Sequence, residues 1–228
     1  MTSPLFELAD ISASLGTEHI LDQLTLTVNR GESLVVTGPS GCGKSSSLKL
    51  LLGGLPWQSG RYLYKGEEVT PAMLPDIRSH CGYIGQESSF GRAIARQVLM
   101  RPFQFSVYKD RIFPEEAMYA LLTRLGMAHE LLDKPMQNLS GGQRQRINII
   151  RALLLEPEIL IADEPTSALD DEAAQSAVEL LLNENSDFKP RTIISVSHDA
   201  RWINHCSRQV TIYHGRVVAQ EERHVHYG

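Results

Sequence analysis

The sequence contains few cysteines. Only Cys42, Cys81 and Cys206 occur among its 228 residues, an odd number with no CxxC pair. This count and spacing argue against a disulfide framework and against a zinc site. We therefore expect three free thiols in a reducing compartment such as the cytosol.

Basic charge and long apolar stretches are also scarce. The 22 Lys and Arg residues are scattered and leave a net charge of −5, which disfavours a nucleic-acid partner. The longest aliphatic stretches, 48–55 and 147–155, fall short of the roughly 20 residues needed to span a bilayer. Residues 1–12 lack the basic region and apolar stretch of a signal peptide, so we expect none. A role at a membrane would then depend on a partner.

The composition, 42% hydrophobic and 21% charged, fits one globular domain over 1–228. Period-2 alternation over 4–12 and 22–28 predicts an antiparallel β portion, and 61–69 and 208–220 predict hairpins. Short apolar runs at 33–37, 81–86, 159–162 and 192–197 predict further strands. Because these runs alternate with helical stretches, including a mostly helical insert from 88 to 135, we expect an α/β fold with a parallel sheet.

A glycine-rich loop follows the predicted strand 33–37 and opens a predicted helix at 44–52. Its sequence GPSGCGKS matches the phosphate-binding pattern G-x-x-x-x-G-K-[ST] in the required strand–loop–helix context. Lys44 should reach the β- and γ-phosphates and Ser45 should bind Mg²⁺, whereas Cys42 fits as a small filler residue. The alternative is a glycine-rich turn without a ligand. The predicted ATP-binding residues in the loop are Gly38, Pro39, Ser40, Gly41, Cys42, Gly43, Lys44, Ser45 and Ser46.

Two adjacent carboxylates, Asp163 and Glu164, end the aliphatic run that starts at 159. Ligands bind at the carboxyl end of a parallel sheet, so we expect Asp163 at the magnesium, with Ser45 and Gln86, and Glu164 at the attacking water. Adjacent residues of an extended chain point to opposite sides, which would give the two acids different tasks. The alternative is a helix-start cap. His198 follows another predicted strand and could orient the γ-phosphate or the water, although a loop histidine without a role is the simpler interpretation.

The phosphate loop, LSGGQ at 139–143, the strand ending in Asp163-Glu164 and S-A-L-D at 167–170 together resemble an ATP-binding cassette (ABC) ATPase over nearly the whole chain. The resemblance implies a RecA-like P-loop NTPase core, an antiparallel β subdomain and a helical subdomain, approximately 88–157, that carries LSGGQ. It also implies roles: Gln86 is the Q-loop glutamine, Asp163 the Walker B aspartate, Glu164 the catalytic glutamate and His198 the switch histidine, while Asp170 belongs to the D-loop.

The LSGGQ segment would give the chain a second phosphate cradle. A serine and two glycines at a helix start form an anion-binding concavity, yet the phosphate loop already holds the chain's own nucleotide. In the ABC family two cassettes pack head to tail, so the signature residues Ser140, Gly141, Gly142 and Gln143 should act on the ATP of a partner copy. We expect two Mg-ATP per homodimer and hydrolysis that depends on dimerisation. An ordinary capped helix would not require glycines there.

One position departs from the family pattern. Members usually place an aromatic residue on adenine about two dozen positions before the phosphate loop, and here the nearest equivalent is Leu15. We expect aliphatic contact with adenine and reduced selectivity for ATP over GTP.

A lone cassette of this kind resembles the motor subunit of a transporter whose polytopic permease is a separate chain. Residues 87–105 are rich in apolar and aromatic side chains and would suit a short cytoplasmic helix of that permease, or else form the core of the helical insert. The chain also resembles the ATPase of the bacterial Fet-type systems associated with iron export. It would then lie on the cytoplasmic face of the inner membrane. The alternative is a soluble ABC ATPase that drives a process such as iron–sulfur scaffold assembly.

Overall fold

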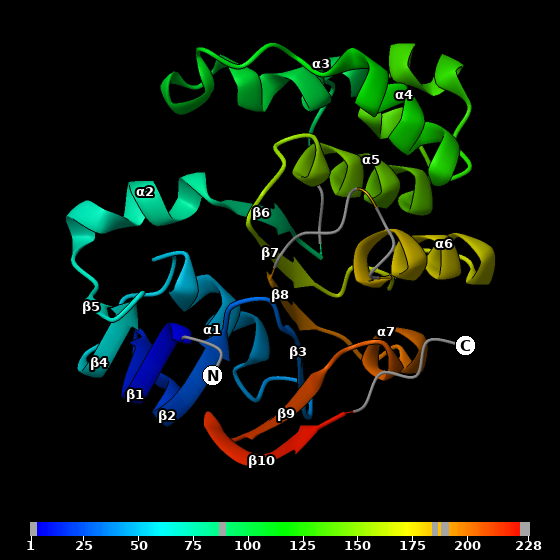
Figure 1. Cartoon of the computed structure of the whole chain (residues 1–228). Coiled ribbons are helices and arrows are strands. Elements are labelled where there is room, and N and C mark those ends of the chain that lie inside the picture. The colour runs from blue at the N-terminus through cyan, green and yellow to red at the C-terminus, as the bar shows by residue number, and fades with distance from the viewer. Residues whose placement is uncertain (1–3, 87–89, 184–186, 188–191, 224–228) are drawn as a thin grey trace.

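The computed structural model describes residues 4–86, 90–183, 187 and 192–223. It contains two β-sheets and a set of helices stacked at one end (Figure 1). Residues 87–89 of the predicted docking stretch lie outside the described residues. All three cysteines are free, and all three are buried.

The first sheet is antiparallel, with the strand order β2-β1-β4-β5. Its strands are β1 (Pro4–Leu15), β2 (Glu18–Asn29), β4 (Ser59–Tyr64) and β5 (Glu67–Glu68). β1 and β2 are longer than the alternation predicts, because register shifts interrupt their pairing and because Asp10 and Gln23 have positive φ. Such bulges break the period of two without ending the strand.

The second sheet is mainly parallel and has the order β10-β9-β3-β8-β7-β6. Its strands are β3 (Ser33–Thr37), β6 (Cys81–Ile84), β7 (Ile159–Asp163), β8 (Thr192–Val196), β9 (Arg208–Tyr213) and β10 (Arg216–Glu222). Only β10 pairs antiparallel, through the predicted hairpin. Every residue of β7 and β8 is buried, which explains their continuous apolar sequences.

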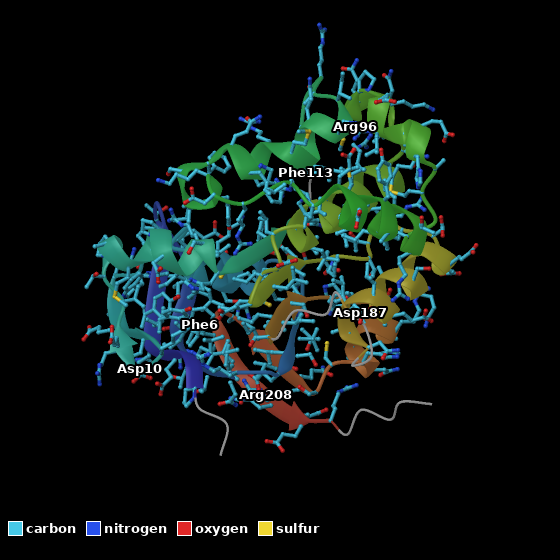
Figure 2. All side chains as sticks on the ribbon, turned by 45° about the horizontal axis from the view of Figure 1, so that its top comes forward. Phe6, Asp10, Arg96, Phe113, Asp187 and Arg208 are labelled. Carbon is cyan, nitrogen blue, oxygen red and sulfur yellow. The ribbon has the colours of Figure 1, made fainter. Side chains whose placement is uncertain are left out.

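Two hydrophobic clusters cover opposite faces of this sheet. Along β7, Ile159 and Ile161 belong to the cluster shared with the antiparallel sheet. Leu160 and Ala162 belong to the other cluster, which packs against the helices that lie between β6 and β7 in the chain. In Figure 2 Phe6, from the first cluster, and Phe113, which packs against the second, lie in separate parts of the molecule. Asp163 continues the alternation on the face of Ile161, which is the side of α1 (Lys44–Leu51).

The remaining helices divide between the core and the helical layer. The core carries α2 (Leu74–Ser79), α6 (Asp171–Leu182) and α7 (Ala200–Asn204). The helical layer is formed by the residues between β6 and β7 in the chain, and it carries α3 (Ala95–Met100), α4 (Glu115–Arg124) and α5 (Gly141–Leu153). Its 3₁₀ turns are Arg101–Gln104, Ser106–Tyr108, His129–Asp133 and Met136–Asn138. A fifth 3₁₀ turn, Pro71–Met73, precedes α2. The bounds 88–157 for a helical subdomain stay a prediction. Within the described ranges, no helix is long and apolar enough to cross a membrane.

Candidate active site

The phosphate loop connects β3 to α1, and two of its glycines are required by close backbone contacts. Gly38 has φ 139°, and a Cβ there would lie 2.1 Å from the Ile212 carbonyl oxygen. Gly43 has φ 104°, and a Cβ there would lie 2.8 Å from the Ile20 carbonyl oxygen. Any larger residue at either position would displace the loop from the strands that support it.

Lys44 lies across this loop. Its side chain is buried, and its Nζ donates hydrogen bonds to the carbonyl oxygens of Gly38 (2.8 Å) and Pro39 (2.7 Å). An ammonium group has three N–H donors, so one remains for a phosphate oxygen. The lysine therefore both closes the loop on itself and presents a positive charge to the space the loop surrounds.

Two of the predicted magnesium-binding residues are in direct contact. Ser45 Oγ donates a hydrogen bond to Asp163 Oδ1 at 2.9 Å, and Asp163 is buried at the end of β7. Gln86, just after β6, lines the same cavity as Ser45. Hydroxyl, carboxylate and amide oxygens are the donors that Mg²⁺ prefers, so these residues fit that ion. Across the described ranges there is no cluster of three or more His, Cys, Asp or Glu side chains suited to another metal.

Glu164 and His198 face each other across the end of the sheet. His198 Nε2 lies 3.4 Å from Glu164 Oε1, and the Glu164 side chain is 14% exposed. Burial raises the pKa of the Glu164 carboxyl, while the His198 charge and backbone oppose the rise. β7 ends at Asp163, and Glu164 has φ 50°, so the expected alternation of an extended chain does not separate the two acids. A left-handed turn separates them instead, held by the hydrogen bond from Glu164 N to Val196 O (2.9 Å).

A cavity of about 530 Å³ brings nine of the predicted residues together. It is lined by Ser40, Gly41, Gly43, Lys44, Ser45, Ser46, Gln86, Glu164 and His198, and also by Glu18, Ile20 and Val196, which sequence reasoning missed. Gly38, Pro39 and Cys42 belong to the loop but do not line the cavity. Leu15 is 69% exposed, three residues before Glu18, and is not part of the lining either. Its contact with adenine stays a prediction.

The signature residues lie elsewhere, at the start of α5. Ser140 Oγ accepts a hydrogen bond from Gln143 N (3.2 Å), and Gln143 Oε1 accepts one from Ser140 N (3.0 Å). This capping box completes the helix start. Ser140 and Gly141 are exposed, and none of the four signature residues lines the cavity.

The two signature glycines have different surroundings. A Cβ on Gly142 would lie 3.0 Å from the Ala168 carbonyl oxygen, whereas at Gly141 the nearest atom, Arg144 Nη2, would be 4.0 Å away. Packing within the chain therefore explains Gly142, contrary to our expectation that a capped helix gives no reason for either glycine. Packing within the described residues does not explain the glycine at position 141. Asp170, in the same segment as Ala168, caps α6 by accepting a hydrogen bond from Ala173 N (2.9 Å).

The fold and the cavity define a P-loop ATPase, with its site at the carboxyl edge of a mainly parallel sheet. The chain belongs to the ABC transporter family, whose model matches residues 21–167. It is an ABC ATPase that binds ATP, and its RecA-like class of fold is confirmed by solved ABC cassettes.

Relatives and solved structures agree with this assignment. The chain is 32% identical over 224 residues to the probable iron export ATP-binding protein FetA of Escherichia coli K12, covering 97% of both chains. It is 34% identical to the macrolide export protein MacB of Pasteurella multocida, but spans only 34% of that protein's length. The dimeric post-hydrolysis structure of the cassette MJ0796 with ADP and Pi aligns over 98% of this chain, with 25% identity and a TM-score of 0.85.

Proposed function

We propose that this chain is the ATP-hydrolysing motor of a transporter, that two copies close head to tail on two Mg-ATP, and that a separate transmembrane permease is driven by this closure. The exposed opening of α5 carries the proposal. It offers a hydroxyl and the first backbone N–H groups of a helix, yet it lies outside the cavity that the chain's own phosphate loop lines. A second copy is the partner that could use it.

The chain has a residue for each task in the hydrolysis. The loop and Lys44 bind the phosphates, while Glu164, held by its turn and by His198, accepts the proton of the in-line water. Ser45, Asp163 and Gln86 would hold Mg²⁺, which supplies charge stabilisation at the phosphates when bound. Ser140 and Gly141 of the partner copy then stabilise the charge on the transferred group.

A groove in the helical layer is the proposed docking surface for the permease. It has a volume of about 500 Å³ and is lined by Phe90, Ala93, Gln97, Val98, Arg101, Pro102, Gln104, Phe105 and Arg151. Phe105 is 57% exposed, and Met100 and Val107 nearby are also exposed apolar residues. An apolar groove with cationic side chains suits a short amphipathic segment that carries a carboxylate. This surface would place the chain on the cytoplasmic face of the inner membrane.

The test is co-purification from detergent-solubilised membranes with a variant of this groove. Phe105→Glu should lose a polytopic partner, while Ile112→Glu, at a 92% exposed position that does not line the groove, should retain it. Both variants should keep basal ATPase activity. A complex that contains only soluble proteins would contradict the transporter role and favour the soluble alternative.

Iron is the proposed cargo, because FetA is matched from end to end by this chain whereas MacB is matched over a third of its length. Cells that lack the chain should accumulate more iron when iron is in excess, and a plasmid copy should reverse this. Unchanged iron content would remove the cargo assignment and leave the ATPase assignment intact.

A further inference from the structure

Asn148 is a buried amide in the middle of α5, where its neighbours are aliphatic. It is 2% exposed, and both ends of its side chain are engaged. Nδ2 donates to the Gly85 carbonyl oxygen at 3.4 Å, and Oδ1 accepts from Arg151 Nη2 at 2.8 Å. A buried amide destabilises a core unless such bonds are made, so its position is set by these two partners.

Arg151 lies one turn further along α5 and belongs to the groove. Its guanidinium stacks over the Phe90 ring, with 5.0 Å between Cζ and the ring centroid, and Nη2 also lies 3.4 Å from the Tyr83 carbonyl oxygen. Burial lowers the pKa of this guanidinium. No carboxylate of the described residues forms an ion pair with it, so neutral oxygens and a ring hold this charge in place.

Gly85 connects these contacts to the nucleotide cavity. It precedes Gln86, which lines the cavity together with Ser45 and Glu164. Glycine has no side chain to anchor it, and a Cβ here would lie 3.1 Å from the Tyr83 ring. The hydrogen bond from Asn148 to the Gly85 carbonyl group therefore restrains this backbone, which has no side chain of its own to anchor it.

We propose that Asn148 is a positioning residue for Gln86, and that Arg151 acts through Asn148. Arg151 orients the Asn148 amide, the amide holds Gly85, and Gly85 sets where Gln86 enters the cavity. The inference rests on the proposed function, since it takes Gln86 as a magnesium-binding residue.

The experiment uses Asn148→Asp and Arg151→Gln in the full chain, each combined with Glu164→Gln so that ATP is not consumed. Aspartate has nearly the same size as asparagine and still accepts from Arg151, but it cannot donate to Gly85. Two quantities are measured: the Mg²⁺ concentration needed for stabilisation by ATP in thermal unfolding, and hydrogen exchange of a peptide that covers 83–86. We expect both variants to need about tenfold more Mg²⁺ and to exchange faster in this peptide.

Two matched controls separate positioning from general loss of stability. Arg101→Gln removes another cation from the same groove, whereas the hydrogen bonds to Asn148 and to the Tyr83 carbonyl group come from Arg151. Ile147→Val removes one methyl group from the neighbouring buried residue of α5. Both should keep the Mg²⁺ requirement and the exchange rate of the parent. The proposal is overturned if Asn148→Asp behaves like Ile147→Val in the exchange measurement.

Gln86→Ala, measured in parallel, separates the role of Gln86 in Mg²⁺ binding from its positioning through Asn148. If this variant leaves the Mg²⁺ requirement unchanged, the role of Gln86 in the proposed function is wrong. If it raises the requirement while Asn148→Asp and Arg151→Gln do not, the link through Asn148 is wrong and the magnesium site stands.

Discussion

At the scale of single residues, Glu164 combines a largely buried carboxyl with a backbone conformation that few glutamates adopt. A non-glycine residue at φ 50° costs about 1 kcal/mol or more. The surrounding strands maintain it, because Glu164 N is bonded to Val196 O. Strain at this residue is consistent with a task that depends on where its carboxylate points.

Glu164→Gln should retain ATP binding and lose most of the turnover. The amide keeps the shape of the side chain but cannot accept the proton of water, and removal of a positioned base commonly costs about 10²- to 10⁴-fold in rate. ATP binding by calorimetry and phosphate release at saturating ATP check the two halves of this expectation. Rapid hydrolysis by the variant would contradict the assignment of the base.

The pH profile of turnover is a second test of Glu164 as the general base. A general base acts when ionised, so activity is lost as the pH falls through its pKa, and burial places that loss at a higher pH than for an ordinary glutamate. The His198 charge lowers the Glu164 pKa, so His198→Ala should move the acidic limb to still higher pH. A limb that stays in place in both variants belongs to another group.

Leu15→Tyr should tighten the binding of both ATP and GTP by about tenfold, because an aromatic ring stacks on either base. Equilibrium binding of each nucleotide measures the effect. Val218→Tyr is the matched control, since Val218 is also an exposed apolar strand residue but does not line the cavity. Unchanged affinities in Leu15→Tyr would show that this residue does not face the base.

At the residue level, positions can be predicted from the sequence where a motif sets the geometry locally. The contact between Ser45 and Asp163 follows from a phosphate loop and a strand end at one edge of a parallel sheet. Glu18, Ile20 and Val196 were missed because their places in the cavity depend on how β2 and β8 pair with other strands. The turn at Glu164 was missed because no pattern in the sequence marks a left-handed backbone at a glutamate.

At the scale of elements, the two glycines at the start of α5 belong to one sequence motif but have different surroundings, which predicts different effects of their replacement. Gly141→Ala should leave the melting temperature unchanged or raise it, because open space surrounds this helical position and alanine favours helices. It should still lower turnover by about tenfold or more, because a methyl group would cover the exposed anion site.

Gly142→Ala provides the comparison, because its Cβ would meet the Ala168 carbonyl group. This variant should lose thermal stability as well as turnover. Thermal unfolding and ATPase rates of both variants test these expectations. Full turnover in Gly141→Ala would contradict the proposed contact with a partner's phosphate.

The elements themselves were largely predictable. Buried strands such as β7 and β8 and the hairpin of β9 and β10 have clear sequence signals, and both sheets have the expected sense. The lengths of β1 and β2 were underestimated because bulges interrupt their period. The pairing of β3 between β8 and β9 could not be predicted, since strand order depends on contacts between distant segments.

At the scale of the whole molecule, the separation of α5's opening from the cavity predicts a catalytic unit of two chains. Specific ATPase activity should rise with protein concentration until the dimer is saturated, and Glu164→Gln with ATP should give a dimer by light scattering. Activity per chain that is constant down to concentrations where only monomer is present would contradict the composite site.

The place of β3 also has a consequence for how the protein is made. β3 leads directly into the phosphate loop, yet both of its sheet neighbours, β8 and β9, come from the last fifth of the sequence. The hairpin of β9 and β10 holds the phosphate loop in place, since Gly215 N donates a hydrogen bond to Cys42 O (3.0 Å) and Arg216 forms an ion pair with Asp22 (2.8 Å). All residues up to Arg216 must therefore leave the ribosome before the nucleotide site can assemble in this arrangement, so ATP binding reports that the last hairpin has been made.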